Sequence, residues 1–208
     1  MIIDDASENS MLYVKITVND VNDNSPKFDY AAYAVGISET DDRQKVLFNL
    51  HASDADLNDR ISYFILNETR EISDESLNEH KYTGFVLNSN TGSLTLNFEV
   101  QESMTGFFSF NVQAIDLANH TDEAIIKVYT IAERHRVTFI FFNTTEQVNS
   151  VNLQGVNAIL SDAYKAECII DDIRDHQLKD LSIDQRKTDF RVHFMRDGEA
   201  VEKDEIFE

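Results

Sequence analysis

The chain has 208 residues and a formal net charge of −20, from 18 basic and 38 acidic residues. This length suffices for two small domains. The acidic charge argues against nucleic-acid binding and against electrostatic docking on an anionic membrane. The single cysteine, Cys168, allows no internal disulfide, and we expect a buried, inert thiol on a strand rather than a reactive one. No run reaches the length of a membrane span, and no signal peptide is visible.

The first predicted strand covers residues 12–18, where apolar and polar side chains alternate. The segment Asp20-Val21-Asn22-Asp23-Asn24 follows, and four of its five side chains carry oxygen donors. Calcium takes about six to eight oxygen ligands, and like charges this close together repel one another without a cation. Asn and Asp are also common turn residues, so the segment alone fits a calcium loop or a polar turn.

Two later strands also end in acidic residues. Asp54 and Asp56 follow an alternating run that starts at Val46, and Asp116 ends another that starts at Phe108. Strand ends of a β-sandwich gather at its poles, so these carboxylates can converge on one cation. A donor set of oxygens alone favours calcium over a catalytic metal. The six histidines are dispersed without a paired Ser or Cys, so we do not expect an enzyme.

An internal repeat supports a domain of about one sandwich. Lys15 and Lys127 lie at equivalent positions, at an offset of 127 − 15 = 112 residues. The same offset aligns residues 20–24 with residues 132–136, where two arginines and a histidine replace the acidic loop. A cationic segment cannot ligate calcium. We therefore expect the second junction, near Glu133, to be calcium-free.

The last third of the chain has a different pattern. A strand is predicted over 137–142, and Thr144 and Gln147 form a capping box that starts a helix running to Tyr164. Further strands over 167–173 and 190–195, a turn at Asp197-Gly198 and a second helix over 201–208 follow. This order is the ferredoxin-like split βαβ pattern. We expect this domain to be truncated, because the pattern also needs a complete second helix and a fourth strand.

Together these motifs resemble those of a cadherin repeat. The segment from Asp20 to Asn24 matches the family's Asp-x-Asn-Asp-Asn linker, Asp54-Ala55-Asp56 matches its Asp-x-Asp, and Ala114-Ile115-Asp116 matches its Ala-x-Asp. In cadherins these groups bind calcium between consecutive repeats and stiffen the junction. The loop after Asp56 is shorter than in the family and lacks its glycine. The resemblance implies these Ca²⁺ ligands: Asp20, Asn22, Asp23, Asn24, Asp54, Asp56, Asn58 and Asp116.

The resemblance implies an all-β Greek-key sandwich followed by an α+β ferredoxin-like membrane-adjacent domain. The expected divisions are residues 1–24 for the end of a preceding repeat and its calcium linker, 25–132 for the last cadherin repeat, and 133–208 for the second domain. Such an arrangement is similar to the membrane-adjacent end of long non-classical cadherins. These include cadherin-23, protocadherin-15 and, most similar in local segments, the insect midgut cadherin-like receptors.

One segment of the repeat resembles a toxin-binding segment of the insect receptors, which reads Gly-x-Leu-Thr-Leu-Asn-Phe-Gln. The segment consists of Gly92, Ser93, Leu94, Thr95, Leu96, Asn97, Phe98 and Glu99. A strand of this kind also occurs in any cadherin repeat, so both interpretations stay open. Alternation places Leu94, Leu96 and Phe98 inward, so we expect the polar side chains and the strand edge to make the contact.

The function implied by the resemblance is a calcium-binding, membrane-proximal receptor module on the extracellular side of the plasma membrane, cut from a single-pass protein. It would dock pore-forming Cry toxins and serve cell adhesion. The alternative is a mechanical tether of the cadherin-23 or protocadherin-15 kind, and a homodimer is compatible with both. Tryptophan is absent, which excludes the Trp-docking adhesion of classical cadherins. Three sequons predict N-glycosylation of a secreted chain, at Asn67, Asn119 and Asn143.

Overall fold

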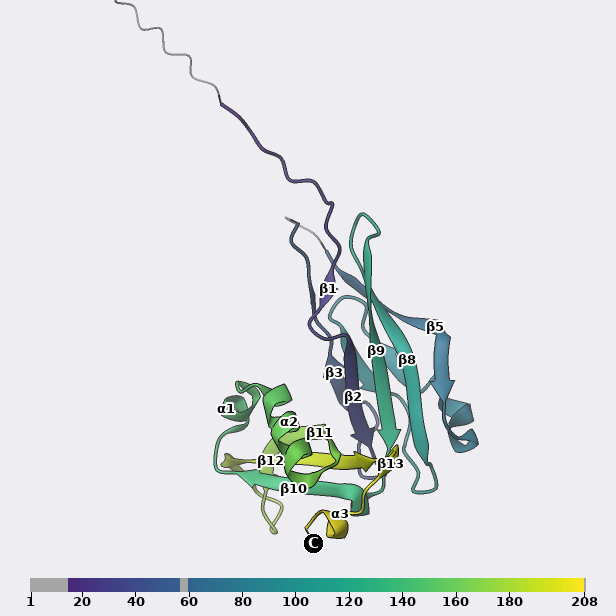
Figure 1. Ribbon diagram of the computed structural model, residues 1–208, viewed down its shortest axis with the longest axis vertical. Coiled ribbons are helices and arrows are strands. Elements are labelled where there is room, and N and C mark those ends of the chain that lie inside the picture. Colours follow the sequence, from purple (N-terminus) through teal and green to yellow (C-terminus); the bar gives the residue numbers. More distant parts are fainter. Residues whose placement is uncertain (1–14, 57–59, 208) are drawn as a thin grey trace, which may run out of the picture.

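The computed structural model describes residues 15–56 and 60–207. Figure 1 shows an elongated β-sandwich with a smaller α/β body across its lower end. Each body has a hydrophobic core of its own, one built from residues between Val35 and Val128 and the other from residues between Val137 and Ile206.

Two sheets build the sandwich, as predicted. The first has the strand order β2-β9-β8-β5, and the second has the order β3-β7-β6. Only β2 and β9 pair in parallel; the other strand pairs of the sandwich are antiparallel. The bounds are β1 Lys27–Phe28, β2 Ala32–Ile37, β3 Val46–Asn49, β4 Ala52–Ser53, β5 Ser62–Ile72, β6 Phe85–Leu87, β7 Ser93–Leu96, β8 Gly106–Ile115 and β9 Thr121–Thr130, with β1 paired to β4 and a 3-10 helix over Glu75–His80.

Strand β8 shows why the two sheets close on each other. Its side chains alternate in burial, so Phe108, Phe110 and Val112 point into the core and are at most 1% exposed. Leu94 and Leu96 of β7 meet them from the facing sheet and are also fully buried. Each such apolar side chain contributes about 1.5–3 kcal/mol when it leaves water.

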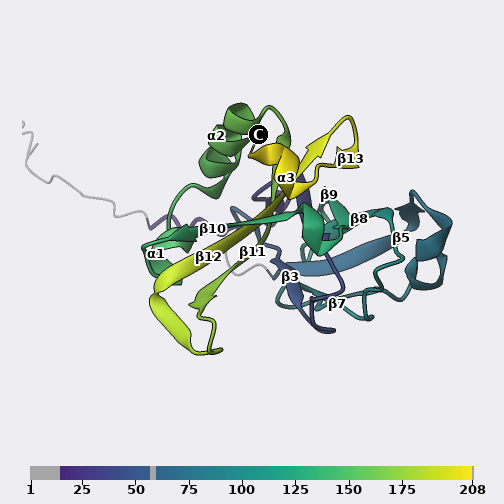
Figure 2. The same cartoon turned by 90° about the horizontal axis from the view of Figure 1, so that it is seen from below.

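The second body is a small antiparallel sheet with helices. Its strand order is β10-β12-β11, with β13 on β12, and Figure 2 shows the three long strands side by side. Alternate residues of β12 serve its two faces: Phe190, Val192 and Phe194 pack in the core with the helices, while Arg191 and His193 face the junction with the sandwich. The bounds are β10 Arg136–Phe141, α1 Thr145–Asn149, α2 Leu153–Tyr164, β11 Glu167–Gln177, β12 Ile183–Arg196, β13 Glu199–Ala200 and α3 Lys203–Ile206, after a 3-10 turn over Glu133–His135.

Two predicted elements differ in the structure. The strand predicted over 12–18 is absent from its described part, residues 15–18, which are exposed and have no regular structure. No described strand lies beside them to accept their hydrogen bonds, and a strand without a partner is not stable in water. The helix predicted from Thr144 to Tyr164 is broken into α1 and α2, because Asn152 accepts a hydrogen bond from Gly155 and starts a new helix.

Other local predictions are confirmed. Thr144 and Gln147 form the predicted capping box at the start of α1. Asp197 and Gly198 both have positive φ, 55° and 87°, as a two-residue hairpin turn requires. The final predicted helix, over 201–208, is shorter than expected, since α3 covers only Lys203–Ile206. The described helices are all too short or too polar to traverse a bilayer. The ferredoxin-like assignment stays a prediction.

Candidate functional site

The upper pole of the sandwich brings together the acidic segments predicted from the sequence. Asn24, just before β1, donates its backbone N–H to Asp56 Oδ2 at 2.8 Å and its side-chain amide to Asp56 Oδ1 at 2.5 Å. The same amide also lies 3.2 Å from Asp23 Oδ1. Although desolvation acts to raise the pKa of Asp56, these hydrogen bonds from Asn24 hold it below its ordinary value. The linker segment is therefore tied directly to the Asp-x-Asp loop after β4.

Asp116, at the end of β8, closes the pole from a third direction. Its carboxylate accepts from the backbone N–H of His120 at 2.6 Å and lies 2.7 Å from the His120 ring nitrogen Nδ1. The hydrogen bond with Asp116, followed by the charges of Asp56 and Asp54, raises the pKa of His120. Three carboxylates from two strand ends therefore act on one imidazole.

The donor atoms of this pole suit a calcium ion only in part. Within residues 15–56 and 60–207, no three His, Cys, Asp or Glu side chains form a group arranged to hold a metal. Two of its oxygens are nevertheless buried without a hydrogen-bond partner among the described residues, Asp54 Oδ2 and Asn22 Oδ1. Unpartnered buried oxygens are costly, and a hard cation would satisfy them. Asp20 is exposed on the incoming segment, and the predicted ligand Asn58 lies outside the described residues.

The lower junction, between the sandwich and the second body, is built around a buried arginine. Arg136 starts β10, and its side chain is only 1% exposed. Its guanidinium lies 3.2 Å from Asp171, 3.1 Å from Asp41 and 2.6 Å from Glu133. It also donates to Ser38 Oγ and to the carbonyl oxygen of Gly36, both in the sandwich. One cationic side chain thus binds carboxylates from both bodies.

The close fit of this junction depends on a glycine. The N–H of Gly36, in β2, donates to Asp171 Oδ1 at 2.8 Å, and that oxygen lies 2.7 Å from His193 Nδ1. A Cβ on Gly36 would come within 2.6 Å of Asp171 Oδ1 and 2.8 Å of His193 Nδ1. Beside the charges, the rings of Tyr129 and His193 meet edge to face at 5.5 Å. A larger residue at this position would force these side chains or the backbone to shift.

The charges of the junction stabilise one another. Burial acts to raise the pKa of Asp41, but Arg136 and Lys45 outweigh it and hold the pKa below its ordinary 3.8. The pKa of Glu133 is likewise lowered, because hydrogen bonds from Thr40 and Ser38 and the charge of Arg136 outweigh burial. Sequence reasoning identified residues 132–136 only as a lost calcium loop and missed this cluster. The available signal was Gly36 inside a strand, which marks a close backbone approach.

The structure agrees with the expected burial of the predicted toxin-binding segment but contradicts its expected position at a sheet edge. Leu94, Leu96 and Phe98 are buried as predicted, at 0%, 0% and 5% exposure. The expected strand edge is wrong, because β7 is the central strand of its sheet and pairs with both β3 and β6. Its backbone pairs with those two neighbouring strands. Only its outward side chains, which include Thr95, remain for a partner.

The sequon asparagines Asn67, Asn119 and Asn143 are all exposed, in β5, in the turn before β9 and after β10.

The comparisons agree with the motifs. A family model described as the Cadherin-23 alpha/beta domain matches residues 108–208. Cadherin-AgCad1 of Anopheles gambiae is 36% identical over 209 residues, which cover 96% of this chain and 12% of that protein. Human Cadherin-23 is 26% identical over 184 residues, covering 86% of this chain and 5% of that protein. A solved structure of Protocadherin Gamma B2 extracellular cadherin domains 1-5 aligns over 59% of this chain and 22% of that chain, with 25% identity and a TM-score of 0.45.

The chain belongs to the cadherin family and is part of a non-classical cadherin ectodomain. The cadherin-domain proteins to which it belongs are not enzymes. It spans 12% and 5% of the length of the mosquito and human relatives named above.

Proposed function

We propose that this chain is the membrane-adjacent end of a cell-surface cadherin-like receptor, stiffened by calcium at its upper pole and bent without calcium at its lower junction. The observation that carries the calcium part is a pair of buried oxygens, Asp54 Oδ2 and Asn22 Oδ1, which have no hydrogen-bond partner within residues 15–56 and 60–207 and lie where three acidic segments meet. A bound calcium ion would neutralise these carboxylates and cross-link the segment to the sandwich. The proposed ligands are Asp20, Asn22, Asp23, Asn24, Asp54, Asp56, Asn58 and Asp116.

The test is a calorimetric calcium titration of the whole chain and of Asp54→Ala. We expect the substitution to weaken calcium binding by about tenfold or more, because it removes a charged ligand. Asp162→Ala is the matched control, since Asp162 is an exposed aspartate on α2 that forms a surface pair with Lys165. Absence of calcium binding to the unaltered chain, or equal binding by both variants, would refute the proposal.

We divide the chain into the end of a preceding cadherin repeat with its calcium linker over residues 1–24, a cadherin repeat over 25–132 and a ferredoxin-like, membrane-adjacent domain over 133–208. Support for the last assignment comes from its strand order. In a ferredoxin-like fold the third strand lies between the first and the second, and the first helix connects the first two strands. Here β12 lies between β10 and β11, and α1 and α2 connect β10 to β11.

We further propose that pore-forming Cry toxins dock on the outer face of the β3-β7-β6 sheet. Thr95 of β7 pairs with Val46 on one side and with Val86 on the other. These two valines are 49% and 50% exposed, so they flank Thr95 with an apolar row on the surface. Exposed apolar side chains beside polar ones are typical of interaction surfaces. The resemblance of Gly92–Glu99 to the toxin-binding segment of the insect receptors supports the same face.

Surface plasmon resonance with immobilised toxin tests this face. The double substitution Val46→Ser and Val86→Ser should weaken toxin binding about tenfold or more, the loss typical of central contact residues. The control is Ile125→Ser, because Ile125 is equally exposed at 49% but lies on the other sheet. Equal toxin binding by the double variant and the control would exclude this face.

The alternative function is a mechanical tether of the cadherin-23 kind. The family match over residues 108–208 favours it, because that model describes the Cadherin-23 alpha/beta domain. A tether needs a junction that resists force and has no need of the valine row. Failure of the unaltered chain to bind any Cry toxin, together with a force-resistant lower junction in single-molecule pulling, would favour the tether.

A further inference from the structure

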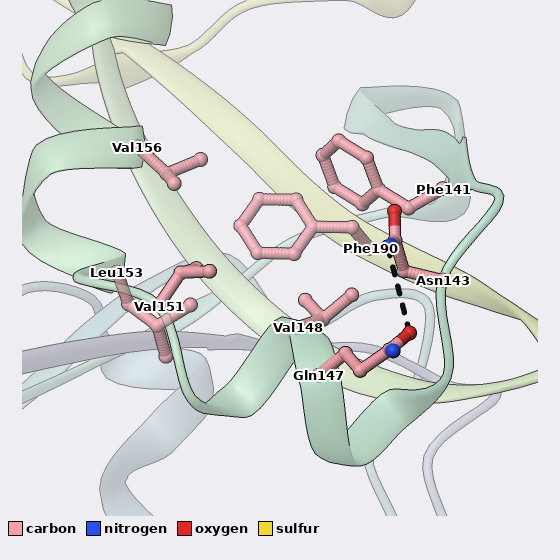
Figure 3. Close-up of a pocket in the computed structure, with 8 residues that line it drawn as sticks. All are labelled: Phe141, Asn143, Gln147, Val148, Val151, Leu153, Val156 and Phe190. Carbon is pink, nitrogen blue, oxygen red and sulfur yellow. Dashed lines mark hydrogen bonds between the residues drawn. The ribbon is translucent and has the colours of Figure 1, made fainter.

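The second body contains an apolar pocket that its own core does not fill. The pocket has a volume of about 300 Å³ and lies between α1, α2 and the strands β10 and β12. Figure 3 shows the rings of Phe141 and Phe190 and the side chains of Val148, Leu153 and Val156 around it. Ligand pockets range over about 300–1,000 Å³, so this one suits a single small ring.

The polar side of the pocket is a sequon asparagine. Asn143 is exposed, and its side chain lines the pocket together with Gln147 (Figure 3). Its backbone oxygen accepts from Thr188 Oγ1 at 2.8 Å, which fixes the backbone. Its Nδ2 lies 3.5 Å from Gln147 Oε1, and Gln147 is itself held by the capping box with Thr144. The asparagine is therefore held at the pocket from both its backbone and its side chain.

We propose that Asn143 carries an N-linked glycan and that the first N-acetylglucosamine of this glycan occupies the apolar pocket against Phe141. The proposal rests on the extracellular location in the proposed function, since the modification is made in the secretory pathway. The occupant is a part of the same molecule, tethered at the pocket wall. It needs no partner protein and no free ligand.

The chemistry of the sugar matches the lining. Phe141 lies two residues before Asn143, so both side chains reach the same pocket. One face of a hexosamine ring presents C–H groups, and its acetamido group ends in a methyl. Both pack favourably on aromatic and aliphatic side chains. The remaining ring hydroxyls point to the open mouth, where water satisfies them.

The attachment step balances without any group on this chain beyond the sequon. The donor is a lipid diphosphate-linked oligosaccharide. The bond from Asn143 Nδ2 to C1 of the first sugar forms while the bond from C1 to the diphosphate oxygen breaks. The lipid diphosphate leaves with that electron pair, and one amide proton is released. The other Nδ2 proton stays and can still donate to Gln147 Oε1.

The experiment uses the whole chain secreted from glycosylating cells. Peptide mass spectrometry measures occupancy of each sequon. One sample is trimmed by an endoglycosidase that leaves the first sugar. Another is stripped completely by an amidase, which hydrolyses the side-chain amide and leaves an aspartate at each former glycan site; this aspartate is present in the stripped samples of both variants compared below. We expect Asn143 to be occupied, and the thermal midpoint of the second body to stay unchanged on trimming but to fall by about 4 °C or more on stripping.

Phe141→Leu separates the pocket effect from a general effect of glycans. In this variant the difference between trimmed and stripped samples should largely disappear, because the two changes act on the same contact. Thr121→Ala, which removes only the Asn119 sequon, should leave the midpoint unchanged. Occupied Asn67 or Asn119 with an empty Asn143 would overturn the inference, as would equal midpoints for trimmed and stripped protein. Sugar at none of the three sites would overturn it together with the extracellular location, whereas loss of calcium binding would leave it standing.

Discussion

The substitution Arg136→Met tests whether one buried cation holds the two bodies together. Methionine keeps much of the length of the side chain but removes the guanidinium. Three carboxylates then lose a partner at the same time: Asp171 at 3.2 Å, Asp41 at 3.1 Å and Glu133 at 2.6 Å. The side chains of Asp171 and Asp41 are 0% and 4% exposed, so water cannot replace the lost contacts without opening the junction.

The cost follows from what each carboxylate retains. Removing one partner of a buried ion pair costs about 3–5 kcal/mol. Every carboxylate here keeps a second polar partner, which places the cost at the lower end, about 3 kcal/mol. That value corresponds to a roughly 100-fold shift of the docking equilibrium toward the open form. The retained partners are Lys45 for Asp41, Arg191 for Glu133 and His193 for Asp171.

Amide hydrogen exchange reports docking directly, because the N–H of Gly36 donates to Asp171 across the junction. We expect exchange at Gly36 to accelerate about 100-fold in Arg136→Met, the shift that ~3 kcal/mol produces, and small-angle scattering to show a longer molecule. The control is Arg134→Met, since Arg134 and Glu202 form an exposed pair at 3.2 Å that contributes at most about 1 kcal/mol. Unchanged exchange in Arg136→Met, or the same change in Arg134→Met, would refute the reasoning.

Four further outcomes are expected. Asp54→Ala should make the segment near residue 24 more susceptible to proteolysis in calcium, while cleavage near residue 133 stays unchanged; equal effects at both would contradict two different junctions. Gly36→Ala should cost about 1–3 kcal/mol in thermal or denaturant unfolding, because a Cβ there meets Asp171 Oδ1 at 2.6 Å. Stability should fall as the pH drops below about 4, since the lowered pKa values of Asp41 and Glu133 give a contribution that is complete only above their ordinary 3.8 and 4.5 and is lost as the pH falls toward the lowered values; a flat acid profile of unfolding would count against the cluster. Cys168 should resist alkylation at neutral pH until the protein unfolds, because burial raises its pKa to about 12; rapid labelling of the folded chain would show an open thiol.

Local pattern predicted three strands of the sandwich, those that became β3, β7 and β8. The alternation in Gly92–Glu99 correctly placed Leu94 and Leu96 in the core, because side chains of a strand point to opposite faces in turn. The same pattern could not show whether that strand lies at the edge or in the middle of its sheet. Its position in the middle of the sheet depends on pairing with β3, some 45 residues earlier in the chain. The single helix predicted from Thr144 is interrupted at Asn152. There the side chain of Asn152 caps a new helix, and the apolar periodicity on both sides of it did not reveal this break.

The sequence alone determined that the upper pole is rich in oxygen donors and that the segment near residue 133 is cationic, because composition and spacing are local properties. Only the tertiary structure decided what the cationic segment does. Arg136 meets Asp41 from 95 residues away and Asp171 from 35 residues away. The sequence gives the sign of a charged residue but does not show which residues it pairs with. Burial, which makes those partners indispensable, arises only when the two bodies pack together.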